Sequence, residues 1–346
     1  MVAGVTSSQI FKHAPRIWLN EPVGARHTFP CSIDFFLAGA DRAVPTDAAT
    51  SDVHYDLASP TSWRAAFHGQ PFTAATAKDK APPVYALVCP QVRIDLATGA
   101  FVEQAGCTVV AYYALFAFNN GKRIRALGGT EVGRHVGDWE RVYVGFEAGE
   151  AATMATKAHN LPIVARPYNC DQFFFMARGS HGSWFDAGEH RYVAGNRFVP
   201  RCVSADIVDE CARGVLWDTK VNLVVVEREV WSGRRAFGGR IRNSGSFEFK
   251  LGLSKSNSTL VRNVFTDIAR WGNRASGCQL LRAVSGGRVA VLGDGPRGPT
   301  VDAACRVSIR ALPRADVVPV DSDADADADA DADNDDDTDT CGSMHF

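Results

Sequence analysis

The sequence has no run of about 18 apolar residues, the length that a membrane-spanning helix needs, so we expect no transmembrane segment. Its first ten residues lack both the basic stretch and the apolar core of a secretory signal, so no secretory leader is expected. Apolar residues occur instead in short runs, with 46% hydrophobic and 22% charged residues in a chain of 346. This composition indicates a globular protein with a sizeable core.

The nine cysteines include no C-x-x-C pair, and their number is odd. Several of them, such as Cys89, lie inside apolar runs. This pattern argues against a closed zinc site and against a disulfide framework. It predicts reduced, buried thiols, which are typical of a cytoplasmic protein, here one that could act peripherally at membranes.

Basic residues are missing from 321–340, which holds eleven of the 39 acidic residues. The rest of the chain therefore carries 37 basic and 28 acidic residues, a net charge of +9. A basic body favours anionic partners such as membrane lipid headgroups. Nucleic acid is not expected as a partner, because no dense Lys/Arg stripe interleaves with aromatic residues. The Asp-Ala segment has too little apolar surface to fold, so 319–346 is predicted to be a disordered acidic tail.

Short β-prone runs, separated by glycine- and proline-containing turns, make up most of the chain. Strands are predicted at 84–89, 108–118, the segment ending at 146, 162–166, 172–178, 221–227, 288–292 and 304–309. Asn119-Asn120-Gly121 is a strong turn signal directly after one of the longest of these runs.

Helices are expected to be few. One is predicted from Ser258 to Gly272, with its apolar residues at helical spacing, and a short one near Pro30. We therefore predict an all-β fold, a β-sandwich with a few decorating helices, in a single domain over 1–318. Residues 41–82, rich in Ala, Thr, Asp and Pro, are predicted to be a surface-loop insertion.

A glycine-marked segment at 133–146 carries the most concentrated candidate chemistry. It places His135, Asp138 and Glu140 at i, i+3 and i+5, where a loop runs into an alternating strand. Because side chains alternate faces in a strand, Asp138 and Glu140 are predicted to share one face while Trp139 takes the other. One imidazole and two carboxylates can bind a divalent ion or perform acid–base chemistry. Surface strands often begin with charged residues, so a structural role stays open.

The glycine-flanked His181 is the second candidate, because the predicted strand at 172–178 delivers it at its end. His181 can supply a second imidazole to the 133–146 cluster, or it can satisfy a buried polar group and hold its own loop. Ser180 precedes it without a G-x-S-x-G elbow, and adjacent side chains on an extended chain point apart, which argues against a serine hydrolase. The glycine-rich segment 293–299 lacks the lysine of a phosphate loop and indicates a rigid turn.

Five motifs follow one another between about residue 11 and residue 300. They are 14–19 with 29–30, 133–144, 179–182 with 188–192, 214–219, and 295–299. In this order they resemble the vacuolar protein sorting-associated protein 62 family, whose signatures include G-x-HVGDWE-x-V-x-V and GSHA…G-x-H-x-Y. The insertion and the acidic tail lie outside the pattern. The family name implies a part in protein delivery to the vacuole, without an established enzymatic chemistry.

The 133–146 segment is also similar, more distantly, to the GHRHDWE signature of necrosis-inducing proteins, which are secreted β-sandwich cytolysins. That resemblance implies a divalent cation that helps to engage sphingolipid headgroups. Gly137 stands where the second histidine of the signature would be. The other positions carry over to His135, Asp138, Glu140, Ser180-His181-Gly182 and, for an upstream acidic ligand, Asn119 or Glu131. The missing secretory signal and disulfide pattern argue against a secreted toxin.

Together, the residues and the resemblance predict a non-enzymatic binding module. It would recognise membrane lipid or glycan headgroups with the help of a divalent cation, in protein sorting or trafficking. Mg²⁺ or Ca²⁺ is expected, and mixed ligation also admits Mn²⁺ or Zn²⁺. The predicted metal ligands are His135, Asp138, Glu140 and His181. The predicted ligand-binding residues are Arg134, Trp139, Ser180, Trp184 and His190.

Two alternatives to this reading remain. One is a metal-dependent hydrolase, in which the same four metal ligands would surround an activated water. The other is a structural protein in which the motif only stabilises loops.

Overall fold

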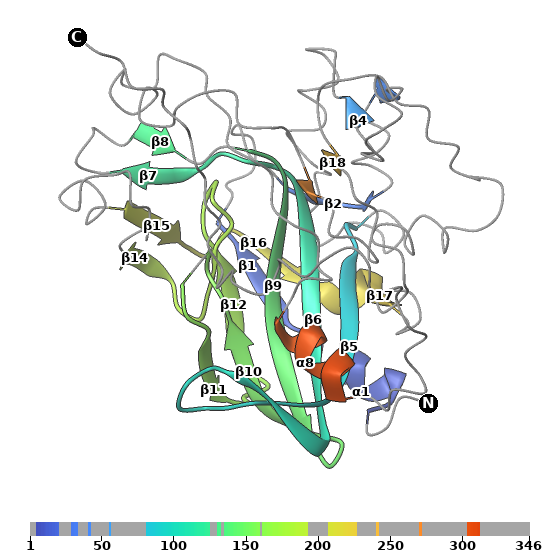
Figure 1. Cartoon of the computed structure of the whole chain (residues 1–346). Helices are drawn as coiled ribbons and strands as arrows, with labels where there is room; N and C mark the ends of the chain where they lie inside the picture. The colour runs from blue at the N-terminus through green and yellow to red at the C-terminus, as the bar shows by residue number, and fades with distance from the viewer. Residues whose placement is uncertain are drawn as a thin grey trace, which may run out of the picture.

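The computed structural model describes a chain that is mostly β-strand in several sheets (Figure 1). The described residues are 5–20, 29–33, 41–42, 55–56, 81–124, 130–132, 135–159, 161–192, 207–226, 240–241, 270–271 and 303–311. The predicted strand at 288–292 and the predicted acidic tail at 319–346 lie outside them. So does the predicted helix from Ser258, apart from Arg270–Trp271, which forms a short strand, β19, paired with β18 (Arg240–Ile241).

The large sheet is built on three long strands, β5 (Val84–Ile94), β6 (Phe101–Asn119) and β9 (His135–Glu147). They are antiparallel neighbours, and Figure 1 shows them running together through the middle of the molecule. Residues 107–119 of β6 are buried without interruption, because both faces of the sheet are covered there. Four further strands complete this sheet: β10 (Glu150–Thr156), β11 (Val164–Pro167), β17 (Leu223–Val226) and β2 (Pro30–Cys31).

A four-stranded sheet packs on one face of the large sheet. Its strands, in spatial order, are β13 (Ser183–Trp184), β12 (Phe173–Met176), β1 (Arg16–Leu19) and β16 (Val215–Asp218). One apolar core joins the two sheets, with Phe174 and Trp217 from the small sheet in the same cluster as Phe116 and Val144 from the large one. Two sheets that share one core form a sandwich, so the predicted all-β fold is confirmed.

A third sheet continues the molecule beyond the start of β9. Its order is β14 (Gly188–Tyr192), β15 (Ile207–Cys211), β7 (Lys122–Ile124) and β8 (Thr130–Val132). The predicted Asn119-Asn120-Gly121 turn links β6 to β7, and Gly121 adopts the left-handed φ of 90° that such a turn requires. The third sheet therefore lies next to the end of β9 that carries His135 (Figure 1).

Three short helices lie among the described residues. The helix α1 (Ser7–Lys12) begins with a capping box between Thr6 and Gln9, and was not predicted. The 3₁₀ helix η3 (Thr219–Asn222) is capped by Asp218. It includes the first two residues of the strand predicted at 221–227, and the observed strand is β17 (Leu223–Val226). In the described ranges no helix is long and apolar enough to cross a bilayer.

The strand predicted at 304–309 is wrong, because this segment forms the helix α8 (Ala303–Ala311). Its buried residues, Ala304, Cys305 and Ser308, lie on one helical face rather than at alternating positions. That face rests on the large sheet, where the Ser308 hydroxyl donates to the Pro90 carbonyl over 2.8 Å. The Cys305 and Cys89 sulfurs lie 3.3 Å apart, and all six cysteines among the described residues are free.

Two short strand pairings lie near other predicted features. Pro30–Cys31 pairs with Phe116 and Leu115 of β6 as the strand β2, and Ile33, in the segment where a short helix is predicted, is helical. Most of the predicted loop insertion at 41–82 lies outside the described residues. Within it, the short strands β3 (Asp41–Arg42) and β4 (Tyr55–Asp56) pair with each other.

Candidate functional site

The strand β9 carries the first half of the motif and divides its side chains between two faces. Asp138 and Glu140, exposed by 4% and 5%, lie opposite Phe116 and Ala114 of β6, whose side chains face the core between the two sheets. Trp139 points to the other face, where its ring packs edge-on against the ring of Tyr85 at 5.8 Å. The alternation predicted from the sequence is confirmed. It puts two carboxylates at the end of an apolar core.

Asp138 is the centre of a compact cluster. Its Oδ2 accepts hydrogen bonds from Asn119 Nδ2 at 2.8 Å and from His181 Nδ1 at 2.9 Å. Its Oδ1 lies 3.8 Å from the Nε2 of His135, whose side chain is 16% exposed. The structure therefore brings together two histidines and one carboxylate that are up to 46 positions apart in sequence, and His135 is the member nearest to solvent.

Backbone geometry at Gly137 allows the imidazole of His135 to approach the carboxylate of Asp138. Gly137 has a left-handed φ of 69°, which glycine adopts without a steric cost. Its carbonyl oxygen lies 2.8 Å from His135 Nδ1, so the imidazole is held with Nε2 toward Asp138. On the neighbouring strand, Asn119 pairs in register with His135, and its side-chain oxygen accepts from the Gly121 N–H of the turn.

A tight loop between β12 and β13 delivers His181. The His181 N–H donates to the Ala177 carbonyl, and the Ala177 N–H donates to the Gly182 carbonyl. His181 has a left-handed φ of 56°, which is uncommon for a residue with a side chain. Its ring stacks on Phe116 with the centroids 3.9 Å apart. Packing and hydrogen bonding thus fix the imidazole against Asp138.

A second buried carboxylate, Asp209 on β15, holds the same loop from the other side. It accepts hydrogen bonds from the Ser180 hydroxyl at 2.6 Å and from Trp184 Nε1 at 3.0 Å. His159 Nε2 lies 2.8 Å away and Tyr192 donates its hydroxyl at 3.3 Å. Asp209 is 1% exposed, so these contacts replace its lost hydration. Its role is to position the loop that carries His181.

The charges of these groups follow from their contacts. Burial alone would raise the pKa of Asp138, but the His181 hydrogen bond, the two histidine charges and the Asn119 hydrogen bond lower it overall. The pKa of Asp209 is lowered in the same way, by His159, Ser180 and Trp184 against burial. Burial lowers the pKa of His135, with Asp138 opposing. Both aspartates are therefore ionised at neutral pH.

Glu140 differs from both aspartates. No described residue forms a hydrogen bond or an ion pair with its carboxylate. Burial and the nearby charge of Asp138 raise the pKa of Glu140 well above its ordinary value, with a further contribution from Asp209. A cation placed beside Glu140 would stabilise its ionised form.

The other predicted ligand-binding residues fall into separate places. Arg134 lies outside the described residues, and Trp139 is buried on the opposite face of β9. Ser180 and Trp184 bind Asp209 rather than Asp138. His190 is on β14, where it stacks on Trp184 at 4.1 Å and contacts the Asp186 carbonyl.

The Asp209–His159 pair could not be predicted from the sequence, because its members are 50 positions apart and neither belongs to a motif. Across the described ranges, no group of three or more His, Cys, Asp or Glu side chains, the Asp138 cluster included, is arranged so that it could hold a metal ion by itself.

No family model matches the chain. The chain is similar to Vacuolar protein sorting-associated protein 62 of Saccharomyces cerevisiae, with 27% identity over 161 residues. The match covers 41% of this chain and 31% of the yeast protein, so it spans less than a third of that protein's length.

Among solved structures, the chain is similar to Necrosis and Ethylene inducing Protein 2 from the causal agent of cocoa's Witches Broom disease. The TM-score is 0.27 at 13% identity, over 65% of this chain and 76% of that one. The predicted resemblance to the vacuolar protein sorting-associated protein 62 family is therefore confirmed as a distant one. The sandwich itself is defined by its own strands and core.

Proposed function

We propose that this chain is a non-enzymatic binding module that recognises anionic headgroups of membrane lipids or glycans through a divalent cation. The cation binds at the Asp138–Glu140 face of β9. The ligand approaches it from the side of His135, the member of the cluster nearest to solvent. One observation carries the proposal: two carboxylates are buried on the same face at the end of the core, and Glu140 has no described hydrogen-bonding partner there. A buried carboxylate without a partner is costly, and a cation removes that cost.

The donor set suits a hard ion. Mg²⁺ is usually held by one or two carboxylates, with water and ligand phosphates completing its octahedron. Such a site needs no cage of three or four protein ligands in the free protein. The ligand itself then supplies coordinating oxygens, so the ion and the headgroup bind together. The name of the yeast relative suggests protein sorting as the process that this binding serves.

Titration calorimetry with Mg²⁺, Ca²⁺ and Mn²⁺ tests the cation. We expect binding to the wild type, and at least tenfold weaker binding to Asp138→Asn and to Glu140→Gln, since each removes a charged ligand. The matched control is Glu103→Gln, an exposed carboxylate on β6 outside the cluster. Binding of equal strength to all four proteins would contradict the proposed site.

Co-sedimentation with phosphatidylserine vesicles and a glycan array, each with divalent cation and with EDTA, tests the ligand. The proposal expects retention by one of the two that is lost in EDTA. Retention that persists unchanged in EDTA would show that headgroups bind without the cation, and no retention on either would overturn headgroup recognition.

A structural role is the second candidate, and the hydrogen bonds of Asp138 favour it. They tie the end of β6, through Asn119, to the loop of His181. If this is the whole function, Asp138→Asn lowers the melting temperature and divalent ions bind neither protein. The calorimetric titration therefore separates the two candidates.

A further inference from the structure

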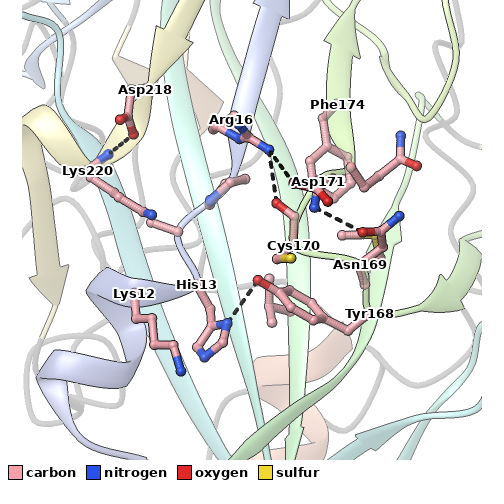
Figure 2. A pocket seen from close by; sticks show the side chains of 15 residues that line it. Lys12, His13, Arg16, Tyr168, Asn169, Cys170, Asp171, Phe174, Asp218 and Lys220 are labelled. Atoms are coloured by element: carbon pink, nitrogen blue, oxygen red, sulfur yellow. Dashed lines mark hydrogen bonds and ion pairs between the residues drawn. The ribbon is translucent and has the colours of Figure 1, made fainter.

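A pocket of about 360 Å³ lies far from the Asp138 cluster, between the end of α1, the turn before β12 and η3 (Figure 2). Val144 lines it, six residues along β9 from Asp138. A strand rises about 3.3 Å per residue, so the two places are roughly 20 Å apart. The pocket is therefore independent of the cluster and of the function proposed above.

The floor of the pocket is apolar. Val144, Met154 and Phe174, all 3% exposed or less, belong to the core between the two sheets and also line the pocket, as its floor. The wall is formed by His13 and Tyr168, which are joined by a 2.9 Å hydrogen bond between the imidazole Nδ1 and the phenol oxygen. A volume of this size, with an apolar floor and a few polar groups, suits a small organic molecule.

The rim carries three basic side chains from three different elements: Lys12 from α1, Arg16 from β1 and Lys220 from η3. Figure 2 shows them around the same hollow as His13. The ammonium groups of Lys12 and Lys220 form no hydrogen bond or ion pair with a described residue. Burial first, and then the charge of Lys12, lower the pKa of His13; Glu150 opposes them, and Lys220 lowers the pKa by a smaller amount than Glu150 raises it. Both lysine charges are thus felt at the imidazole of His13.

Two acidic residues at the rim reduce this charge without cancelling it, because they face three cations. Asp218 accepts the Lys220 backbone N–H as the cap of η3 and keeps its negative charge there. Asp171 lies 3.9 Å from Arg16 and its side chain is 91% exposed, so water screens the pair. Arg16 is fixed by a different contact, a 3.0 Å hydrogen bond to the Cys170 carbonyl, while its guanidinium stacks over Phe173. Its position does not depend on Asp171.

We propose that this pocket binds a small organic anion. The carboxylate or phosphate group of the ligand lies among the cations of Lys12, Arg16 and Lys220. Its apolar part lies on the floor formed by the core. An inorganic ion would make no contact with the apolar floor, and a neutral ligand would leave the positive charge uncompensated. The pocket therefore favours a ligand that has both a negative charge and an apolar part.

Saturation-transfer NMR and calorimetry with three probes test the pocket: phenyl phosphate, benzoate and the neutral benzyl alcohol. We expect one or both anions to bind, at least about tenfold more tightly than benzyl alcohol, because charge-assisted contacts favour the anion. Which anion binds better decides between phosphate and carboxylate. Failure of both anions to bind at millimolar concentrations would overturn the proposal.

Variants locate the binding. The double substitution Lys12→Gln/Lys220→Gln should weaken binding of the better anion by about tenfold or more, since each lost cation removes a charge-assisted contact. Both side chains are exposed, so the fold should be retained, which a melting curve verifies. Asp171→Asn should change binding by less than about twofold, because water already screens its charge. Arg191→Gln, on the exposed face of β14, is the matched control, and equal effects of Arg191→Gln and the double variant would refute the site.

Discussion

Three buried carboxylates lie in one region of the sandwich, and they differ in how their charge is compensated. Asp138 accepts two hydrogen bonds from nitrogen donors, and the Asp209 carboxylate contacts four residues, two on strands and two in loops. Glu140 receives none from a described residue, although it is 5% exposed. The ionised form of Glu140 is therefore the one that opposes folding in the metal-free protein.

In metal-free buffer, Glu140→Gln should stabilise the protein at pH 7 by about 1–3 kcal/mol, because it removes a buried charge without a partner. The raised pKa means that the folded state binds the Glu140 proton more tightly than the unfolded state does. The stability that this proton provides is fully present below about pH 4 and is lost as the pH rises through the folded pKa. The gain from Glu140→Gln should therefore shrink as the pH falls.

Chemical denaturation of wild type and Glu140→Gln at pH 7 and pH 4, in EDTA, measures this difference. The expected gain corresponds to a rise in melting temperature of about 2–4 °C per kcal/mol. Glu103→Gln again serves as the control, with no expected change. Equal stability of wild type and Glu140→Gln at pH 7 would mean that Glu140 is already compensated.

Single residues of the motif could be predicted because β-strand geometry is regular. The spacing of Asp138, Trp139 and Glu140 is enough to assign their faces. His159 and Asp209 could not be predicted, because only the tertiary fold brings them to within 2.8 Å.

At the scale of elements, the β12–β13 hairpin positions His181. Gly182 lies in its loop, and an added Cβ would lie 2.6 Å from Asp209 Oδ2 and 2.7 Å from His159 Nε2. Neither atom can move freely, because each belongs to the buried network around Asp209. This glycine is therefore required for close approach between the hairpin and β15.

Gly182→Ala should destabilise the protein by about 1–3 kcal/mol through overpacking, and should also displace His181. Thermal melts give the first effect, and the imidazole NMR signals of His159 and His181 give the second. Gly106→Ala is the comparison, since its Cβ would meet open space and the cost is limited to about 1–2 kcal/mol of left-handed backbone. Unchanged histidine signals in Gly182→Ala would disprove the positioning role.

The strands and helices differ in how well their own residues predict their secondary structure. The strands β5 and β6 were predictable, because their apolar runs are long and both faces are buried. The short strands β1 and β16 were not predicted, since four residues give little periodicity and their pairing is with distant partners. The helix α8 was mistaken for a strand, because its burial depends on docking to β5 and β6.

At the scale of the whole molecule, charge is divided between a basic body and an acidic segment at 321–340. If anionic membranes are the partner, removing 319–346 should strengthen binding to phosphatidylserine vesicles roughly tenfold at low salt, because eleven like charges are lost. The gain should fade near physiological salt, where the Debye length is about 8 Å. Co-sedimentation across a salt series measures it, and a tail that leaves binding unchanged at every salt concentration has no shielding role.

The docking of α8 has a consequence for the strand β5. The strand β17 ends at Val226 beside Leu87 of β5, and α8 places Cys305 against Cys89, two residues further along the same strand. With strand spacings near 4.8 Å and 3.3 Å per residue, Val226 and Ala303 are on the order of 15–20 Å apart. Two described residues that are 77 positions apart in sequence are therefore held beside one strand, so a change in β5 should disturb both β17 and α8.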